Sequence, residues 1–327
     1  MCAAAVEEAA AIIRAGGLVA FPTETVYGLG ADALNTIAVG RIYVAKGRPA
    51  FNPLIVHVDD VEGVRTVARH VPPMAEALAE VFWPGPLTLV LPKRPLVPDA
   101  VTAGLDSVAV RVPAHAVARM LIACAQRPIA APSANASTRV SPTTAAHVVQ
   151  QLGASLDLIL DGGPTSVGIE STVVDLTGPR PVLLRPGGIP RDAIERVVGE
   201  LVLVSSAARG DVPLPSPGMM ERHYAPQAQL VAFDAEERDD IAARIAAHER
   251  SGGRAALLAH DVDDVTATCV LSMPRDSEAY ARKLYAALHT IDDAQCDLAF
   301  VERVPFGVQW DAVRDRLRRA GVAGDAG

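Results

Sequence analysis

Short apolar runs alternate with longer amphipathic segments along the chain up to about residue 205. Runs such as LVAF (18–21), LIVHV (54–58) and LTLVL (87–91) are short and rich in aliphatic residues, which favours buried strands. Between two of them, NTIAVGRIYVAKG (35–47) has apolar residues at helical spacing and ends at a glycine. The alternation predicts an α/β domain with a twisted mixed sheet and flanking helices.

Residues 227–327 repeat this alternation more regularly. The strand-like LVAFD (230–234) precedes the helical DDIAARIAAHERSG (239–252), and the strand-like AALLAH (255–260) follows. Short loops between alternating strands and helices predict a smaller, Rossmann-like α/β domain with a parallel sheet. This part of the sequence has no glycine-rich phosphate loop, so we predict no nucleotide site within it.

The segment between these regions has the composition of a linker. SSAARGDVPLPSPGMMERHYAP (205–226) contains four prolines and two glycines and has no amphipathic period. We therefore predict a first domain over 1–205, a linker over 206–226 and a second domain over 227–327. The proline-rich end of the linker, 216–226, predicts a lid that closes over bound ligands.

Composition excludes several classes of protein. The 327-residue chain has a mean hydropathy of +0.23 and a net charge of −8, which argues against coating nucleic acid or an anionic membrane. No stretch approaches the ~20 uncharged apolar residues of a membrane span. The four cysteines form no CxxC pair or Cys/His cluster, which argues against disulfides and structural zinc and favours a cytoplasmic protein. The beginning, MCAAAVEEAAAIIRAGG, lacks the basic start of a signal peptide and is interpreted as a helix.

The loop KGRPAFNP (46–53) is the most specific candidate for binding an anion. Lys46, Arg48 and Asn52 lie there beside two prolines. Only three of the 30 basic residues of the chain are lysines, so a lysine at this point indicates a need for a compact ammonium group. Two cations two residues apart suit a polyanion such as a triphosphate. The alternative is a pair of solvated cations at the end of a helix.

Two arginines interrupt apolar strands. Arg111 lies in AVRVP and Arg185 in LLRPGG, and a buried arginine is costly unless it is paired. The carboxylate that pairs with Arg111 comes either from the protein or from a ligand, and because no acid occurs in VAVRVPAHAVARM, we expect a ligand to supply it. His57, inside LIVHV, is either a packed histidine or a ligand-binding one.

Hydroxyl groups gather in the loops that follow the predicted strands, in PTETVYGLGADA (22–33), APSAN (131–135) and GIESTVVDL (168–176). Ser141, followed by Pro142, predicts the N-cap and first residue of a helix. The glycines of GLGADA also match a dinucleotide-binding fingerprint, although six residues separate them from the strand. The sequence has no Ser–His–Asp order, P-loop or HExxH motif. These cations and hydroxyls therefore favour phosphoryl or nucleotidyl transfer, in which the substrate supplies the nucleophile.

Taken together, the motifs resemble the YrdC/threonylcarbamoyl-AMP synthase family, and the linker and second domain resemble its long, two-domain form. The resemblance runs from about residue 10 to the end and rests on FPTETVYGLG, AKGRPAFNPLIVHV, FWPGPLTLVL, VAVRVP, APSAN, GIESTVVDL, LLRPGGI and SPGMMERHYAP. It implies a YrdC-like first domain. It also implies that L-threonine, bicarbonate or CO2, and ATP give threonylcarbamoyl-AMP and pyrophosphate, with Mg²⁺ carried on ATP.

The resemblance further implies that the product passes to the tRNA threonylcarbamoyl-transfer machinery. That machinery would modify adenosine 37 of tRNAs reading ANN codons, and binding of tRNA by this chain itself would be weak or indirect. One alternative is a tRNA- or double-stranded-RNA-binding module without catalysis, which the net charge of −8 disfavours. The other is a dinucleotide-dependent enzyme that uses the GLGADA loop.

Site residues are implied by the same resemblance, and none of them is a metal ligand. Lys46 and Arg48 are the expected catalytic residues. The residues expected to bind L-threonine are Thr25, His57, Arg111, Ala131 and Ser171. The residues expected to bind ATP are Arg48, Asn52, Ser107, Ser133, Asn135, Ser141, Arg185 and Tyr224. The sequence departs from the family at Met220, where Lys or Arg is usual, and at Glu221, which places the linker's contact with phosphate in doubt.

Overall fold

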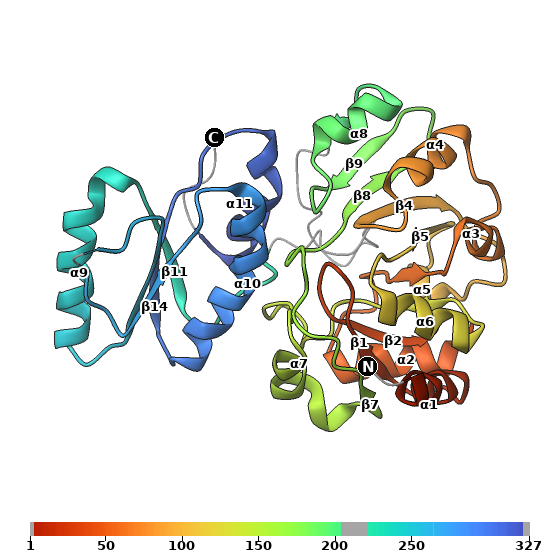
Figure 1. Ribbon diagram of the computed structural model, residues 1–327, viewed down its shortest axis with the longest axis horizontal. Helices are drawn as coiled ribbons and strands as arrows, with labels where there is room; N and C mark the ends of the chain where they lie inside the picture. Colours follow the sequence, from red (N-terminus) through yellow and green to blue (C-terminus); the bar gives the residue numbers. More distant parts are fainter. Residues whose placement is uncertain (1–2, 204–221, 264, 323–327) are drawn as a thin grey trace. The chain divides into compact units, whose positions relative to one another are not determined.

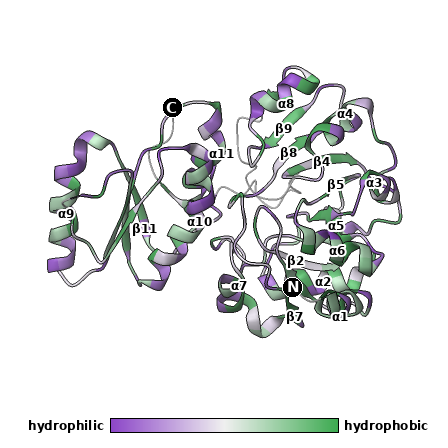
Figure 2. Cartoon of the chain, viewed as in Figure 1, coloured by the Kyte–Doolittle hydropathy of each residue, from purple (hydrophilic) through white to green (hydrophobic). Residues whose placement is uncertain are grey.

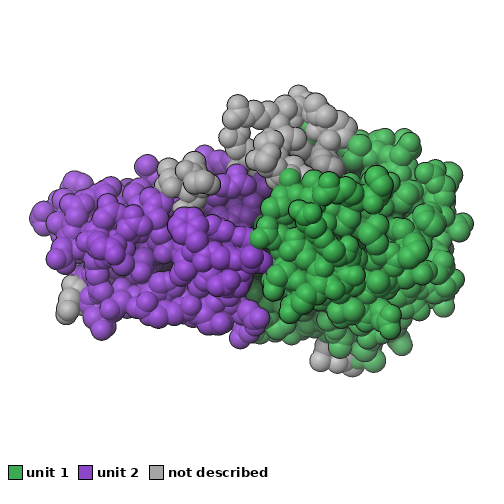
Figure 3. Space-filling model, turned by 90° about the horizontal axis from the view of Figure 1, so that it is seen from above, with its two compact units in different colours: residues 1–137, 141–221 green, residues 138–140, 222–327 purple. Residues whose placement is uncertain are grey.

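A computed structural model of the chain describes residues 3–203, 222–263 and 265–322. The chain divides into two compact units, one formed by residues 1–137 and 141–221 and the other by residues 138–140 and 222–327 (Figure 3). Most of the predicted linker, including Met220 and Glu221, lies outside the described residues, so the predicted lid stays a prediction.

The first unit is built on a mixed sheet of ten strands (Figure 1), as the hydrophobic pattern predicts. Strand β3 is parallel to β5, whereas β4 is antiparallel to β5. Figure 2 shows that strands such as β8 and β9 are mostly hydrophobic. Across the sheet the strands are β10 (Val202–Leu203), β9 (Val182–Arg185), β8 (Thr172–Asp175), β4 (Leu87–Pro92), β5 (Ser107–Arg111), β3 (Ile55–His57), β6 (Ile129–Ala130), β2 (Gly28–Asp32), β1 (Val19–Phe21) and β7 (Leu158–Ile159).

Helices cover this sheet with alanine- and valine-rich faces. The buried residues Val6, Ala10 and Ile13 pack with Val117 and Leu121 in one apolar cluster, and small side chains let these helices approach closely. The helices are α1 (Ala3–Arg14), α2 (Thr36–Lys46), α3 (Val61–Val67), α4 (Pro73–Phe82), α5 (Asp99–Thr102), α6 (Ala116–Ala125), α7 (Ala145–Leu152) and α8 (Arg191–Val198), with a 3-10 turn η1 (Gly153–Ser155).

Helix α2 brings the KGRP loop to its place. The Asn35 side chain accepts hydrogen bonds from the backbone N–H groups of Ile37 and Ala38, which fixes the start of the helix. Gly47 ends it with a left-handed φ of 59°, a conformation that glycine adopts without strain. Lys46 is therefore the last helical residue, and the following loop turns away.

The helix predicted to begin at Ser141 begins later. Helix α7 starts at Ala145, and the Thr144 hydroxyl accepts from the His147 N–H as its cap. Residues before the cap pair with other loops instead, because the Tyr27 N–H donates to the Pro142 carbonyl at 2.9 Å. The prediction that Ser141 is an N-cap was wrong, and its hydroxyl is used elsewhere.

The second unit contains a parallel sheet of four strands, as predicted from its alternating pattern. Helix α9 covers one face of this sheet, and α10 and α11 cover the other (Figure 1). The elements are β11 (Gln229–Phe233), η2 (Ala235–Glu237), α9 (Arg238–Arg250), β12 (Ala255–Ala259), β13 (Cys269–Ser272), α10 (Ser277–Asp293), β14 (Leu298–Glu302), η3 (Val308–Trp310) and α11 (Asp311–Ala320). No helix among the described residues has the length and hydrophobicity to cross a bilayer.

Candidate active site

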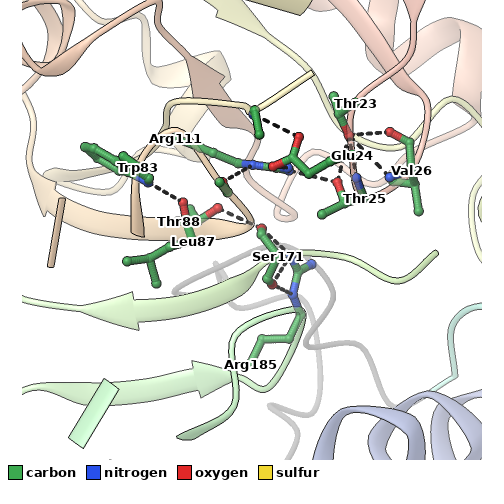
Figure 4. Close-up of polar contacts among 12 residues, drawn as sticks. Thr23, Glu24, Thr25, Val26, Trp83, Leu87, Thr88, Arg111, Ser171 and Arg185 are labelled. Atoms are coloured by element: carbon green, nitrogen blue, oxygen red, sulfur yellow. Dashed lines mark hydrogen bonds and ion pairs between the residues drawn. The ribbon is translucent and has the colours of Figure 1, made fainter. Parts of the chain in front are cut away.

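Arg111 organises one part of the site in the first unit. Strands β3 and β5 are parallel and pair His57 with Arg111, so both side chains lie where their strands end. The Arg111 guanidinium donates to Glu24 Oε1 at 2.6 Å, to Thr25 Oγ1 at 2.9 Å and to the Gly85 carbonyl at 3.2 Å (Figure 4). Of the two sources of a carboxylate considered for Arg111, the protein supplies one, because Glu24 reaches it from a loop far away in sequence; binding of a ligand carboxylate stays a prediction.

The pairing still leaves Arg111 able to bind a ligand. A guanidinium has five N–H bonds, and these contacts use three of them. The described residues supply no acceptor for the other two. Two N–H bonds in one plane match the two oxygens of a carboxylate.

The loop between β1 and β2 holds Thr25 against Arg111. The Thr23 hydroxyl donates to the Val26 carbonyl at 2.6 Å and lies 2.8 Å from the Thr25 hydroxyl (Figure 4). Such side-chain to backbone bonds stabilise a tight turn. The PTETVY sequence thus shapes a turn that presents Glu24 and Thr25 to Arg111.

His57 is buried next to this pair and stays neutral. Burial lowers its pKa to about 3, and the positive charge of Arg111 contributes in the same direction. A neutral imidazole both donates and accepts a hydrogen bond. His57 is therefore an uncharged polar side chain beside Arg111 that can both donate and accept a hydrogen bond.

Ser171 connects the first part of the site to Arg185. The Arg185 guanidinium donates to the Ser171 carbonyl at 3.1 and 2.9 Å and to its hydroxyl at 3.2 Å (Figure 4). The Ser171 hydroxyl lies 2.8 Å from the hydroxyl of Thr88 on β4. These bonds fix the Arg185 side chain over the end of strand β9 from which it comes.

Lys46 organises the other part of the site. Its ammonium group donates to the backbone carbonyls of Ser133 and Asn135. Burial and the nearby Arg48 hold the pKa of Lys46 well below its usual value, and the charge of Glu170 opposes this only in part. Arg48 in turn donates to the Asn52 carbonyl at 3.0 Å, so the two cations and the loop 46–53 form one structure.

Glu170 joins the two parts. Its carboxylate accepts a hydrogen bond of 2.6 Å from the Ser141 hydroxyl, and its neighbour in the chain is Ser171. The site thus buries four basic side chains and two carboxylates. The basic side chains are Lys46, Arg48, Arg111 and Arg185, and the carboxylates are Glu24 and Glu170. Several basic side chains gathered in one site favour the binding of an anion.

The remaining predicted residues lie in different places. Ala131 follows β6, and its N–H donates to the carbonyl of Ile55, which lies two residues before His57 in β3. Ser107 begins β5 and pairs with Pro92 of β4. Tyr224 belongs to the second unit, where its ring lies 5.7 Å from that of Tyr285, so its predicted contact with ATP stays a prediction.

Two acidic residues escaped the sequence reasoning, although both lie in the quoted motifs PTETVYGLG and GIESTVVDL. An acidic residue next to hydroxyl-bearing residues was the available signal, because Glu24 lies between two threonines and Glu170 precedes Ser171. The alternative dinucleotide fingerprint is wrong, because Gly28–Asp32 forms strand β2 rather than a turn into a helix. A Cβ atom at Gly30 would lie 2.7 Å from Phe21 Cε1, so close packing explains this glycine.

Comparison with known proteins identifies the family of this chain. Residues 11–187 match the family described as "Telomere recombination", and residues 189–322 match the family described as "Threonylcarbamoyl-AMP synthase, C-terminal domain". The chain belongs to the threonylcarbamoyl-AMP synthase family. The family resemblance inferred from the motifs is confirmed, and the second match identifies the two-domain form.

Relatives of this family match nearly the whole chain. A threonylcarbamoyl-AMP synthase of Pyrococcus abyssi is 46% identical over 95% of this chain and 92% of its own length. One from Bacillus subtilis is 42% identical over 96% of this chain and 92% of its own. The crystal structure of P. abyssi Sua5 with L-threonine is 45% identical and has a TM-score of 0.93 over 98% of this chain and 95% of its own. The two-domain α/β fold is thereby confirmed.

Proposed function

We propose that this chain is an L-threonylcarbamoyladenylate synthase, a nucleotidyltransferase that uses L-threonine, bicarbonate or CO2, and ATP. The observation that carries the proposal is the match over nearly the full length of the chain to curated synthases of that name. The four basic side chains that the site buries support it independently, because both the amino-acid carboxylate and the triphosphate are anions.

Threonine binds at the Arg111 end. The two N–H bonds that Arg111 keeps clamp the carboxylate, and Thr25 beside it fixes the angle of the guanidinium. Neutral His57, the Ala131 backbone and the Ser171 hydroxyl surround the amino group and the side chain. A neutral His57 suits this place, because a second cation would repel the amine in its protonated form.

ATP binds at the Lys46 end. Lys46 and Arg48 face the phosphates, and the approach of phosphate anions raises the pKa of Lys46, so the lysine holds its proton in the complex. The resemblance to the family assigns further residues to ATP. They are Asn52, Ser107, Ser133, Asn135, Ser141, Arg185 and Tyr224.

The reaction needs no nucleophile from the protein. The threonine amine adds to CO2 and loses a proton to give a carbamate. A carbamate oxygen then attacks the α-phosphorus of ATP, the bond from that phosphorus to the α,β-bridging oxygen breaks, and pyrophosphate leaves. The chain contributes position and neutralised charge, which is how phosphoryl-transfer sites work in general.

Magnesium enters with the nucleotide in this proposal. The described residues hold no group of three or more His, Cys, Asp or Glu side chains that could bind a metal ion. Mg²⁺ usually binds through substrate phosphates and few carboxylates. Bound there, it would supply charge neutralisation for the departing pyrophosphate.

The product passes to the machinery that transfers the threonylcarbamoyl group to tRNA, and the reaction takes place in the cytoplasm. Binding of tRNA by this chain is weak or indirect, in keeping with its net charge of −8.

A pyrophosphate-release assay tests the proposal. We expect release only when L-threonine, bicarbonate and Mg²⁺–ATP are all present. L-Serine should be a poorer substrate by about 10- to 200-fold, because a missing methyl group costs roughly 1–3 kcal/mol of discrimination. Equal release without threonine would show that the site hydrolyses ATP and does not join it to threonine.

A further inference from the structure

The loop 161–168, between β7 and β8, lies against the turn that carries Glu24 and Thr25. Two of its backbone N–H groups donate to that turn, from Val167 to the Glu24 carbonyl at 2.7 Å and from Gly168 to the Thr25 carbonyl at 3.2 Å. The side chains of the same two turn residues accept hydrogen bonds from the arginine at the end of β5 (Figure 4). The loop therefore supports the backbone that presents both acceptors to this arginine.

Tyr27, which follows the turn in the chain, fastens the other end of this loop. Its hydroxyl donates to the Gly163 carbonyl at 2.8 Å and accepts from the Gly162 N–H at 3.2 Å. The Asp161 carboxylate lies 3.3 Å from the same hydroxyl and accepts from the Gly163 N–H at 2.9 Å. One hydroxyl thus joins the first three residues of the loop to the segment that forms the turn.

The Tyr27 hydroxyl keeps its proton throughout the neutral range. Burial raises the pKa of Tyr27 to about 12, and the charge of Asp161 acts in the same direction. The hydroxyl therefore remains a donor to the loop, and its loss would leave the Gly163 carbonyl without this bond.

The path of the loop depends on close packing at the point where Tyr27 holds it. A Cβ atom at Gly162 would lie 2.6 Å from Pro22 Cγ, so the loop approaches the strand end that precedes the turn. Gly163 and Gly168 have φ values of 81° and 84°, which glycine adopts without strain. The loop therefore has one defined path between its two attachments.

The backbone of Tyr27 has separate partners. Its N–H donates to the Pro142 carbonyl at 2.9 Å, and its carbonyl accepts from the Ala134 N–H at 2.8 Å. Replacing Tyr27 by phenylalanine removes only the hydroxyl and leaves both backbone bonds possible. The change therefore isolates the attachment of the loop 161–168.

We propose that Tyr27 is a positioning residue for L-threonine, because its hydroxyl holds the loop 161–168 against the turn that presents Glu24 and Thr25 to Arg111. The inference rests on the function proposed above. A guanidinium binds a carboxylate through two parallel N–H bonds only when its plane is correctly oriented. A turn that is less firmly held would orient Arg111 less well, and threonine would bind more weakly.

The test compares Tyr27→Phe with Tyr43→Phe in the full chain. Tyr43 is a matched control, because its hydroxyl also donates to a backbone carbonyl, that of Ala100, at 2.8 Å, and burial also raises its pKa. Its hydroxyl lies 3.2 Å from the Asn52 carbonyl as well. Each variant loses one hydroxyl bonded to backbone groups, and only Tyr27 bonds to the loop 161–168.

We expect Tyr27→Phe to raise the Kd for L-threonine about three- to tenfold in calorimetry, while the Kd for ATP stays within about twofold. The amides of Val167 and Gly168 should exchange hydrogen faster than in the wild type. Tyr43→Phe should lower the urea midpoint of unfolding by a similar amount, yet it should leave the Kd for threonine and the exchange of these two amides unchanged.

Asp161→Ala is a second variant that acts on the same attachment from the surface. Asp161 is exposed, so its replacement leaves the core intact. Its loss removes the bond to the Gly163 N–H and should raise the Kd for threonine about threefold. If Tyr27→Phe fails to fold, Asp161→Ala decides the outcome.

An unchanged Kd for threonine in folded Tyr27→Phe would overturn the inference. Equal losses of affinity for threonine and ATP, or an equal loss for threonine in Tyr43→Phe, would assign Tyr27 a purely structural role and also overturn it. When the wild type binds threonine and releases pyrophosphate as proposed, any of these results removes this inference alone. A wild type that binds no threonine would overturn the proposed function and this inference together.

Discussion

The two units bury arginines in different ways. In the second unit, Arg316 and Arg319 both donate to Asp315 at 2.9 Å, and all three belong to helix α11. In the first unit, Arg185 donates to the carbonyl and hydroxyl of Ser171, and Arg111 divides its donors among Glu24, a hydroxyl and a carbonyl.

We predict that this difference separates a structural arginine from a ligand-binding one. An arginine whose carboxylate lies within one turn of the same helix forms its pair as the helix forms. An arginine at a strand end donates to oxygens that distant segments supply, and this position favours a ligand-binding role. On this account, the origin of the partners of a buried arginine, and not its burial alone, predicts a site.

Arg111→Ala should have the largest effect on ligand binding. It should weaken threonine binding by about 2–5 kcal/mol, because a buried charge pair with the carboxylate is lost. Isothermal calorimetry on a variant shown to be folded measures this. The matched change in the second unit, Arg319→Leu, should lower stability and leave threonine affinity as it is. Unchanged threonine affinity in folded Arg111→Ala would make Arg111 as structural as Arg319.

Lys46→Met should lower the rate of pyrophosphate release on the order of 10²-fold, the usual effect of removing one donor from a developing anion. The side chains have similar length, so packing at the end of α2 is largely kept. Steady-state kinetics with saturating threonine measures the effect. A rate close to that of the wild type would show that the bonds of Lys46 to Ser133 and Asn135 serve only the fold.

His57→Gln tests whether the buried histidine stays neutral, through the pH dependence of stability. Native His57 stays neutral down to about pH 3, whereas in the unfolded chain it takes up a proton near pH 6.5. Unfolding therefore takes up a proton between these two pH values. The contribution of His57 to the free energy of unfolding falls by about 1.4 kcal/mol for each pH unit by which the pH decreases. The free energy of unfolding of His57→Gln should decline less steeply from pH 6 to pH 4. Equal slopes would mean that His57 ionises in the native protein.

Thr144→Ala gives the smallest effect, a loss of about 1 kcal/mol from the cap of α7. Its effect on threonine and ATP affinity should be negligible. Ser141→Ala should instead weaken ATP binding, because its hydroxyl bonds to Glu170 and caps no helix. Denaturant unfolding and calorimetry distinguish the two changes. Equal effects of both on stability alone would remove Ser141 from the site.

The sequence predicts some of this architecture and not the rest. Local alternation predicts both sheets and helix α2, because hydrophobic spacing and a terminal glycine act within a few residues. It does not predict that Glu24 reaches Arg111, because that contact depends on which strands pair. Nor does it show that GLGAD forms strand β2, since the packing of Gly30 against Phe21 is tertiary. The family motifs name most candidate site residues, yet the bond from Ser141 to Glu170 is seen only in the folded chain.

The most direct test of the central claim follows the carbon of bicarbonate. The protein is incubated with ¹³C-bicarbonate, L-threonine and Mg²⁺–ATP, and the reaction is quenched in the cold. The mass of the nucleotide product is then measured by mass spectrometry. We predict an adenylate that contains threonine and one labelled carbon, formed in equal amount to pyrophosphate. An adenylate that contains threonine without the label, or AMP alone in every sample, would contradict the account.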